Sequence, residues 1–394
     1  MRDYFGLASP IRFTSVIDGD CVNSRDGRLT PDGLILSLTL AAPAGHSVTV
    51  NGNPARETAP GTYETDVLLR GYRNSLTARD ETDGTEYSAA IFRMPGAEGH
   101  YRLSSDDNIL FLQDLTEHPG RYPSLFDHPY LAVYKKAHDL YGAKVHLNLF
   151  YALDAEARRR FSDRPRDFDL SMMTDAYREE FRRNAHWLKL AFHARAEFPD
   201  APYRGEDAAR ITDDCIAVCR EIVRFAGEEC ISNSTTAHWG SANREAVRSL
   251  RALGMRSLTG YLTLGANGNP SVSYYLSKEL VQHLDNRDFW VDTAEDMIFG
   301  RIDKVLNLDS LEKVQEDVRD AIAHPHRGGF VSVMIHEQYF YPDYRRHLPD
   351  FEQRVLSACR ILAEAGYTGA HISDVTAEPA LRQCAAFHST KESV

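Results

Sequence analysis

The feature that most constrains the fold of this 394-residue chain is a change of pattern near residue 95. Between about residues 11 and 94, short extended runs alternate with turn residues, including the hairpin-type pairs Asn51-Gly52 and Asp83-Gly84. Beyond residue 100, extended runs alternate with segments whose apolar residues recur every three or four positions. The chain is therefore expected to hold an all-β part followed by an α/β part.

The first part has the length and the strand spacing of a small β-sandwich. Its segment V-T-V-N-G, followed by a strand and then by L-L-R-G-Y-R-N-S-L-T-A, resembles bacterial immunoglobulin-like domains appended to carbohydrate enzymes. The resemblance implies an immunoglobulin-like module over residues 1–96. The segment M-P-G-A-E-G at residues 94–99 is predicted to be a linker.

The second part is predicted to contain about seven strands with helices between them. The strands are expected at residues 101–105, 144–151, 188–193, 231–238, 256–260, 330–336 and 369–373. Ser241 and Asp350 are expected to cap the N-termini of two helices. Strands that alternate with helices indicate a parallel α/β barrel or open sheet, here over residues 100–384. Such folds place active groups at the carboxyl ends of their strands.

Charge and hydropathy exclude some classes of partner. The 57 acidic and 45 basic residues give a net charge of -12, which repels phosphate backbones, so no nucleic acid is expected to bind. Two long uncharged stretches, residues 33–55 and 257–277, are broken by Gly, Pro and Asn and are not expected to span a membrane. The start M-R-D-Y-F-G-L lacks the apolar core of a signal peptide, which predicts a cytoplasmic protein; an extracellular location stays open if a leader was removed.

Acidic and imidazole side chains gather at four predicted strand ends. The first strand ends in Asp106 and Asp107, the third in His193, the fourth in His238 and the sixth in His336. The carboxyl ends of parallel strands meet at one rim of the sheet. Carboxylates and imidazoles at one rim are what a catalytic metal site with an open coordination position requires.

The segments around these strand ends resemble the polysaccharide deacetylase family of carbohydrate esterases. In family order they are L-S-S-D-D-N, K-V-H-L-N-L-F-Y, H-A-R-A-E-F, T-T-A-H-W-G-S-A-N and V-S-V-M-I-H-E. The resemblance covers residues 100 to about 374 and implies a distorted (β/α) barrel. It also implies a divalent metal, expected to be zinc, and a hydrolase that removes acetyl groups from an acetylated poly- or oligosaccharide.

The resemblance also assigns roles to single residues. It implies that Asp106 is the general base, Asp107 and His193 are metal ligands, and His336 is the general acid. Two segments depart from the family pattern. Glu197 stands where the family has the second histidine of a His-x-x-x-His segment, and a segment with His238 replaces one that carries an arginine. Either His238 or Glu197 could complete the metal site, and His238 is favoured.

Several of these residues also have structural interpretations. The pair Asp106-Asp107 could cap a following helix. A lone buried histidine is more often hydrogen-bonded in a core than bound to a metal. Trp239 and Tyr339 could stack on sugar rings or pack in the core, and Glu337 could be a ligand or a substrate contact.

Three functions are open at this point. The leading one is the metal-dependent deacetylase, which predicts about one divalent ion per chain. The second is a non-catalytic, saccharide-binding pseudoenzyme of the same fold. The third is a metal-free glycoside hydrolase or lyase that uses carboxylates such as Asp106, Asp107, Glu197 and Glu337.

Overall fold

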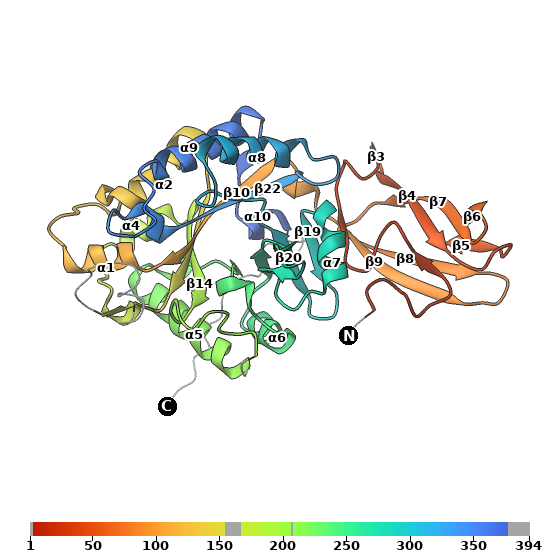
Figure 1. The fold of residues 1–394 in the computed structure, drawn as a ribbon, viewed down its shortest axis with the longest axis horizontal. Coiled ribbons are helices and arrows are strands. Elements are labelled where there is room, and N and C mark those ends of the chain that lie inside the picture. Colours follow the sequence, from red (N-terminus) through yellow and green to blue (C-terminus); the bar gives the residue numbers. More distant parts are fainter. Residues whose placement is uncertain (1–2, 154–166, 206–207, 377–394) are drawn as a thin grey trace.

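The computed structural model describes residues 3–153, 167–205 and 208–376. The first part is built of strands, and Figure 1 shows it at one end of an elongated molecule, beside a larger α/β part. Its strands are β1 Arg12–Phe13, β2 Cys21–Val22, β3 Arg28–Thr30, β4 Gly33–Ala41, β5 Val48–Val50, β6 Asn53–Ala59, β7 Thr62–Leu69, β8 Arg73–Asp80 and β9 Glu86–Arg93.

These strands pair in the order β1-β4-β7-β6-β5-β8-β9-β2, with β3 added beside β4. Alternate residues of β4 point inward, because buried and more exposed positions alternate along it. Asn51 and Gly52 join β5 to β6 with φ values of 50° and 80°, as a tight hairpin turn requires. That this part is an immunoglobulin-like domain with a boundary at residue 96 stays a prediction.

The α/β part begins at β10. Its strands are β10 His100–Asn108, β11 Val145–Phe150, β12 Ala152–Leu153, β13 Phe168–Asp169, β14 Leu188–Ala194, β15 Ser234–Thr235, β16 Ser257–Gly260, β17 Thr263–Leu264, β18 Pro270–Ser271, β19 Phe289–Asp292, β20 Met297–Arg301, β21 Lys304–Val305, β22 Phe330–His336 and β23 Thr368–Gly369. Its α-helices are α1 Leu110–Glu117, α2 Pro129–Tyr141, α4 Arg178–Asn184, α5 Ala208–Phe225, α6 Arg244–Ala252, α7 Lys278–His283, α8 Leu311–Ala323, α9 Phe351–Glu364 and α10 Ile372–Thr376.

The central sheet is parallel and curled into a half-barrel, with the order β14-β11-β10-β22-β21 and β23 beside β10. A second sheet, β15-β16-β20-β19, continues from it through a bridge between Leu190 and Ile231. Helices α2, α8 and α9 lie together along one side, and α5 packs on β14 (Figure 1). The mixed α/β architecture with a parallel sheet agrees with the expectation from the sequence.

Several details of the predicted α/β part are wrong. Strands β19 and β20 match none of the expected strands, and β19 runs antiparallel to β20 within an otherwise parallel sheet. The strand expected at 231–238 contracts to β15. Only residue 369 of the strand expected at 369–373 is extended, because Ile372 and Val375 pack into a core from one face of α10. Short apolar runs fit a helix or a strand equally well. The predicted end of this part, residue 384, lies outside the described residues.

One predicted helix cap is wrong, and the other is right in its position but not in its hydrogen bond. Helix α6 starts two residues later than expected, where the side chain of Asn243, not Ser241, accepts the backbone N–H of Ala246 at 2.8 Å. Asp350 precedes α9 but makes no capping bond, because its carboxylate accepts the Arg354 guanidinium at 2.8 Å instead. A nearby cation therefore outcompetes the local backbone for this carboxylate.

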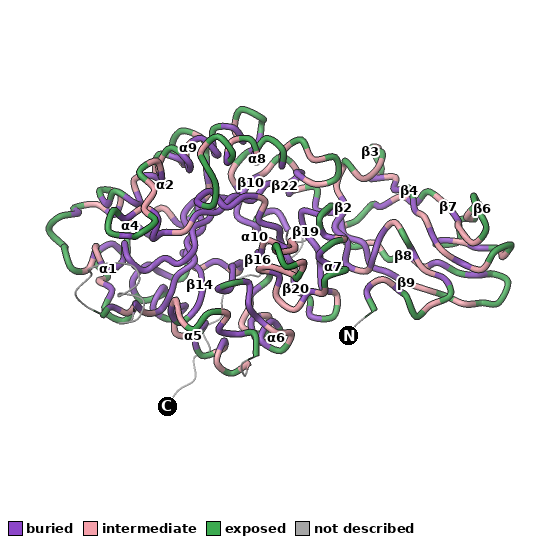
Figure 2. Tube along the Cα trace, viewed as in Figure 1, coloured by how far each residue is buried: buried purple, intermediate pink, exposed green. Residues whose placement is uncertain are grey.

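The two faces of the central sheet differ in character. Tyr101 and Leu103 of β10 belong to the main hydrophobic core, which the surrounding helices complete. The residues that alternate with them, Arg102 and Ser104, face the concave inner side and are fully buried there. Figure 2 shows the strands of this region buried along their length. The inside of the half-barrel is therefore polar although solvent does not reach it.

Polar contacts tie the β part to the α/β part. Buried Asp20 accepts hydrogen bonds from His283 at 2.8 Å and from Arg287 at 3.2 Å. The side chain of Asn23 donates to Asp288 at 3.3 Å, and Arg25 donates to backbone carbonyls in the last turn of α8 and just after it. The two parts are thus held by hydrogen-bonded charges as well as by apolar packing.

Among the described residues, none of the helices combines the length and the apolar character that crossing a bilayer requires.

Candidate metal centre

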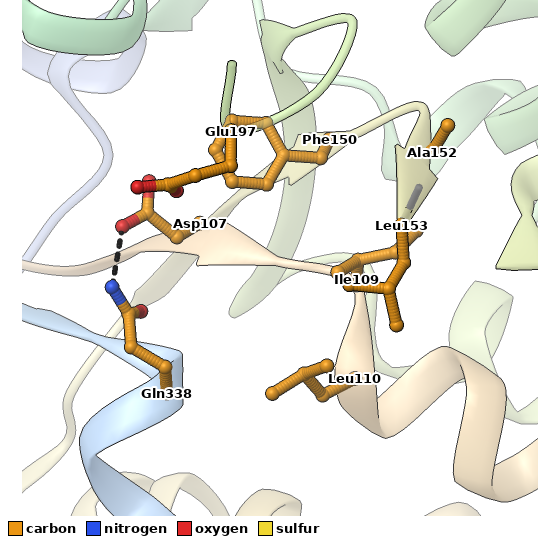
Figure 3. A pocket seen from close by; sticks show the side chains of 8 residues that line it. All are labelled: Asp107, Ile109, Leu110, Phe150, Ala152, Leu153, Glu197 and Gln338. Carbon is orange, nitrogen blue, oxygen red and sulfur yellow. Dashed lines mark hydrogen bonds between the residues drawn. The ribbon is translucent and has the colours of Figure 1, made fainter. Parts of the chain in front are cut away.

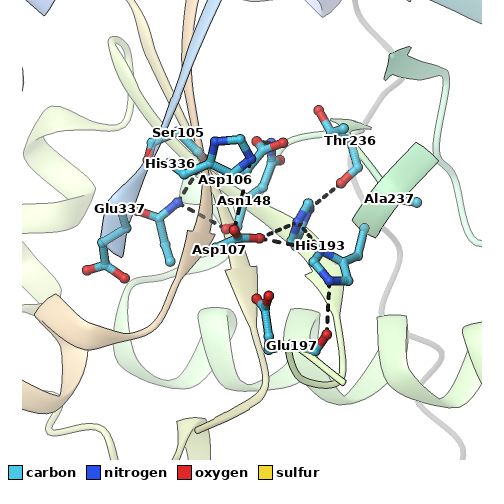
Figure 4. Close-up of polar contacts among 12 residues, drawn as sticks. Ser105, Asp106, Asp107, Asn148, His193, Glu197, Thr236, Ala237, His336 and Glu337 are labelled. Carbon is cyan, nitrogen blue, oxygen red and sulfur yellow. Dashed lines mark hydrogen bonds and ion pairs between the residues drawn. The ribbon is translucent and has the colours of Figure 1, made fainter. Parts of the chain in front are cut away.

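The two adjacent aspartates of the site lie where β10 leaves the sheet. Asp106 is still paired with His336 of β22, and the register of β10 against β11 shifts between Ser105 and Asn108. Asp107 adopts a left-handed backbone conformation with φ 63°, which costs a residue with a side chain about 1–2 kcal/mol. This break in the alternation lets both aspartates face the same rim, as Figure 4 shows.

Asp107 meets two histidines from neighbouring segments. His193 stands near the end of β14, and His238 begins the short 3-10 helix η5 (His238–Gly240) after β15. Asp107 Oδ1 lies 3.0 Å from His193 Nε2 and 3.4 Å from His238 Nδ1, and the two nitrogens are 3.1 Å apart. All three residues are buried and form a group that could hold a metal ion.

Backbone carbonyls fix which nitrogen of each histidine faces the site. His193 Nδ1 donates to the carbonyl of Thr236 at 2.5 Å, and His238 Nε2 donates to the carbonyl of Glu197 at 3.1 Å. A carbonyl only accepts, so these two nitrogens carry the protons of the neutral rings. The opposite nitrogens then turn lone pairs toward Asp107, which is the arrangement of imidazoles that ligate a metal.

The spacing of the three ligand atoms fits a small divalent cation. Bonds of about 2.0–2.1 Å in a tetrahedral site place ligand atoms about 3.3 Å apart. The three observed separations, 3.0, 3.1 and 3.4 Å, bracket that value. One carboxylate and two imidazoles suit zinc among other metals, and three protein ligands leave a position for water or substrate. The residues present therefore fit the metal that the sequence leads us to expect.

The charges of the group also suit a cation. Burial opposes ionisation of Asp107, but close contacts with His193, His238 and His336 hold its pKa well below the ordinary value. Burial lowers the pKa of His238, so that ring is neutral at physiological pH. Burial opposes protonation of His193 too, yet Asp106 and Asp107 raise its pKa above the ordinary value. The centre thus combines an anionic oxygen with imidazoles and attracts positive charge.

The proposed base and acid stand beside this group. Asn148 of β11 donates to Asp106 Oδ1 at 2.6 Å and holds that carboxylate in place. His336 Nδ1 lies 2.9 Å from Asn307 Oδ1, an oxygen that only accepts, so this nitrogen carries a proton. His336 Nε2 consequently faces the site, 4.0 Å from Asp107 Oδ2. Figure 4 shows Asp106 and His336 on the same side of Asp107.

The two residues after His336 have different roles: one stabilises a helix and the other contacts the candidate metal centre. Both oxygens of Glu337 accept backbone N–H groups at the start of α1, from Ile109 at 2.6 Å, Leu110 at 2.8 Å and Phe111 at 2.7 Å. Glu337 therefore caps α1, and its carboxylate points away from the histidines in Figure 4. Gln338 turns the other way and donates from Nε2 to Asp107 Oδ2 at 2.8 Å.

The other predicted contacts lie around the centre. Glu197 gives its carbonyl to His238 and extends its side chain toward Asp107 (Figure 3), but it is not part of the Asp-His-His group. Trp239 is 51% exposed, with its ring 5.9 Å from that of His238. Tyr339 is buried, and its ring packs 6.1 Å from that of His336.

A pocket opens beside the candidate ligands. Figure 3 shows its polar side formed by Asp107, Glu197 and Gln338. The other lining residues are apolar: Ile109, Leu110, Phe150, Ala152 and Leu153. A small apolar group bound here would lie next to the carboxylate of Asp107.

Sequence reasoning missed three of the residues that position the site. Asn148, Asn307 and Gln338 hold Asp106, His336 and Asp107, respectively. Asn148 lies in a strand segment that the family resemblance includes, and Gln338 follows the predicted His336-Glu337 pair by one residue. Asn307 had no such signal.

Comparisons with known proteins give structural neighbours of low similarity. No family model matches the sequence, and no curated protein matches it either. A CE4 family pseudoenzyme from Bacillus anthracis is 11% identical over 71% of this chain and 66% of its own length, with a TM-score of 0.34. A candidate polysaccharide deacetylase from Mycobacterium smegmatis is 11% identical over 71% of this chain and 90% of its own, with a TM-score of 0.38.

A CE4 esterase from Streptococcus mutans is 12% identical over 70% of this chain and 87% of its own, with a TM-score of 0.35. These three neighbours bear names of the family that the sequence resembles, and they include a pseudoenzyme as well as an esterase.

Proposed function

We propose that this protein is a metal-dependent hydrolase that removes acetyl groups from an acetylated poly- or oligosaccharide. The observation that carries the proposal is the convergence of three lone-pair atoms, from Asp107, His193 and His238, beside Asp106 and His336. A catalytic metal site needs this combination of three protein ligands, an open position and nearby groups that transfer protons.

Asp107, His193 and His238 would hold the metal, with zinc the best match to one carboxylate and two imidazoles. When bound, the divalent cation supplies a water of lowered pKa and polarises the acetyl carbonyl. Gln338 fixes the second oxygen of Asp107, so that Oδ1 stays directed at the histidines. Glu197 contributes through the carbonyl that orients His238.

Asp106 and His336 would move the protons. Asp106, anchored by Asn148, accepts a proton from the attacking water. His336, whose Nδ1–H is engaged by Asn307, presents Nε2 and donates its proton to the leaving nitrogen or oxygen of the sugar. The register that pairs Asp106 with His336 keeps base and acid side by side on adjacent strands.

The surroundings suit an acetylated sugar. The apolar pocket next to Asp107, with Ile109, Leu110, Phe150 and Leu153 in its lining, would accept the acetyl methyl group. Trp239, exposed at the rim beside His238, would offer its ring to the apolar face of a pyranose.

The decisive experiment measures bound metal and released acetate in the same protein. Native protein purified without chelator is expected to hold about one divalent ion per chain and to release acetate from N- or O-acetylated oligosaccharides. His193→Ala and Asp107→Ala should lose both properties. His186→Ala, which removes an exposed histidine away from the site, is the matched control and should retain both.

The outcome also separates the proposal from its rivals. Native protein that carries no metal would overturn the metal-dependent mechanism. Glycan binding that is insensitive to chelator, without turnover, would identify a pseudoenzyme. Cleavage of glycosidic bonds that persists in chelator would identify a metal-free hydrolase or lyase.

A further inference from the structure

A second polar cluster lies inside the half-barrel, below the metal centre. Strand register places Arg102 opposite Ser332 and Ser104 opposite His146, so these four side chains share the inner face of the sheet. The ring of His371, which precedes α10, lies 6.3 Å from the ring of His146. All five residues are buried. The proposed reaction uses none of them.

Arg102 is a buried cation with unused donors. Its side chain is inaccessible to solvent, and its Nη1 donates to Ser104 Oγ at 2.6 Å. Its Nε and Nη2 have no hydrogen-bond acceptor among the described residues. Burial lowers the pKa of Arg102 to about 10, so the guanidinium stays charged at physiological pH. A buried charge needs a partner of opposite sign, because its loss of hydration is otherwise uncompensated.

The neighbouring imidazoles add donors but no negative charge. No ring nitrogen of His146 or His371 forms a hydrogen bond within the described part of the chain. Burial holds the pKa of His146 well below its ordinary value and lowers that of His371 to about 3. Both rings are therefore neutral, and each carries one N–H. Ser332 Oγ likewise has no partner among the described residues.

The nearby carboxylates are engaged elsewhere. The charge of Asp106 acts on Arg102, but the two form no ion pair, and Asp106 Oδ1 accepts Asn148. The charge of Asp374 acts on His371, and its Oδ2 accepts the ammonium of Lys144 at 2.7 Å. The buried surroundings of Arg102 thus combine a positive charge with several donors that have no acceptor among the described residues.

We propose that the inside of the half-barrel binds a small monovalent anion of the size of chloride. The free edge of Arg102, Nε and Nη2, donates to it from one side, and N–H groups of His146 and His371 donate from the other. A water molecule would accept only two of these hydrogen bonds and would bring no negative charge into contact with the guanidinium. A single-atom anion satisfies several donors at once. None of the groups that would hold the anion is a candidate metal ligand or one of the two residues proposed to move protons.

Bromide exchange tests the site directly. Crystals of the native protein are soaked in bromide in place of chloride, and diffraction is recorded at the bromine edge. One anomalous peak in contact with Arg102 Nε and Nη2 is expected. Density for water alone at this position, without an anomalous signal, would overturn the proposal. Because the native protein is used, the result does not depend on whether a variant folds.

Thermal unfolding provides a second test in solution. The melting temperature should rise by about 2 °C for each tenfold increase in chloride above its Kd, with gluconate used to keep the ionic strength constant. Arg102→Met should lose this dependence. Arg79→Met, which removes an exposed arginine of β8, should keep it. A melting temperature of native protein that is indifferent to the choice of anion would count against the site.

Discussion

Replacing Glu337 by glutamine is expected to destabilise the protein by about 3 kcal/mol, although the two side chains have almost the same shape. The carboxylate is completely buried and accepts three backbone N–H groups, with Oε2 bound to Ile109 and Leu110 and Oε1 bound to Phe111. Helix α1 has no cap from its own N-cap residue, so Glu337 is the group that satisfies its first N–H donors.

The magnitude follows from what glutamine can replace. The amide oxygen of glutamine can take the place of Oε2 and accept the same two N–H groups. Because this oxygen is uncharged, each of the two hydrogen bonds is expected to become weaker by about 1 kcal/mol. Its NH₂ group then faces the N–H of Phe111, and an unsatisfied buried donor costs about 1–3 kcal/mol. A total near 3 kcal/mol corresponds to a fall of roughly 4 °C in melting temperature for a chain of this size.

Urea-induced unfolding followed by circular dichroism measures this loss. Glu352→Gln is the matched control, because Glu352 is an exposed acid in the first turn of α9. Its free energy of unfolding should change by less than about 0.5 kcal/mol. If Glu337→Gln lowers the free energy of unfolding by less than about 1 kcal/mol and weakens substrate binding, the capping role is refuted. Glu337 would then be a substrate contact.

Three further predictions concern the site and the junction. His238→Ala should reduce metal affinity about 100-fold or more by dialysis against a metal buffer, whereas Glu197→Gln should reduce it less than 10-fold; the reverse order would make Glu197 the third ligand. Asn148→Ala, which frees Asp106, should lower kcat about 10- to 100-fold at unchanged metal content, and an unaltered kcat would argue against Asp106 as the base. Burial, with the charge of Asp303, raises the pKa of Asp288 to about 7, so the folded protein holds a proton that the unfolded chain has lost above about pH 4. The stabilisation from this carboxyl, about 4 kcal/mol below pH 4, should therefore decline as pH rises through 7, and Asp288→Asn should flatten the pH dependence of the melting temperature between pH 5 and 8. An identical profile in that variant would contradict the assignment.

The sequence could predict which side chains the strand ends bring together, whereas metal binding by those side chains stays a prediction. Asp107, His193 and His238 follow or end separate strands, and the carboxyl ends of parallel strands meet, so their convergence could be expected without coordinates. The catalytic roles of Asp106 and His336 remain proposals that the experiments above address.

The residues that orient these groups could not be found in the same way. The imidazole tautomers are fixed by the backbone carbonyls of Thr236 and Glu197. Every residue has a backbone carbonyl, so no residue type in the sequence marks these two. Gln338 and Glu337 are neighbours, yet one contacts Asp107 and the other caps α1, because the short helix η7 (Glu337–Phe340) turns them in different directions. Only the tertiary fold separates such roles.

The hydrogen-bonded junction has a practical consequence for protein engineering. The change of pattern near residue 95 suggests cutting the gene there to express the α/β part alone. Such a fragment would lose Asp20, which accepts His283 and pairs with the largely buried guanidinium of Arg287. It would also expose the apolar surface that Cys21 and Phe92 cover on Phe330 and Phe289. The shortened protein should be prone to aggregate, so the whole chain is the better starting material for assays of the metal centre.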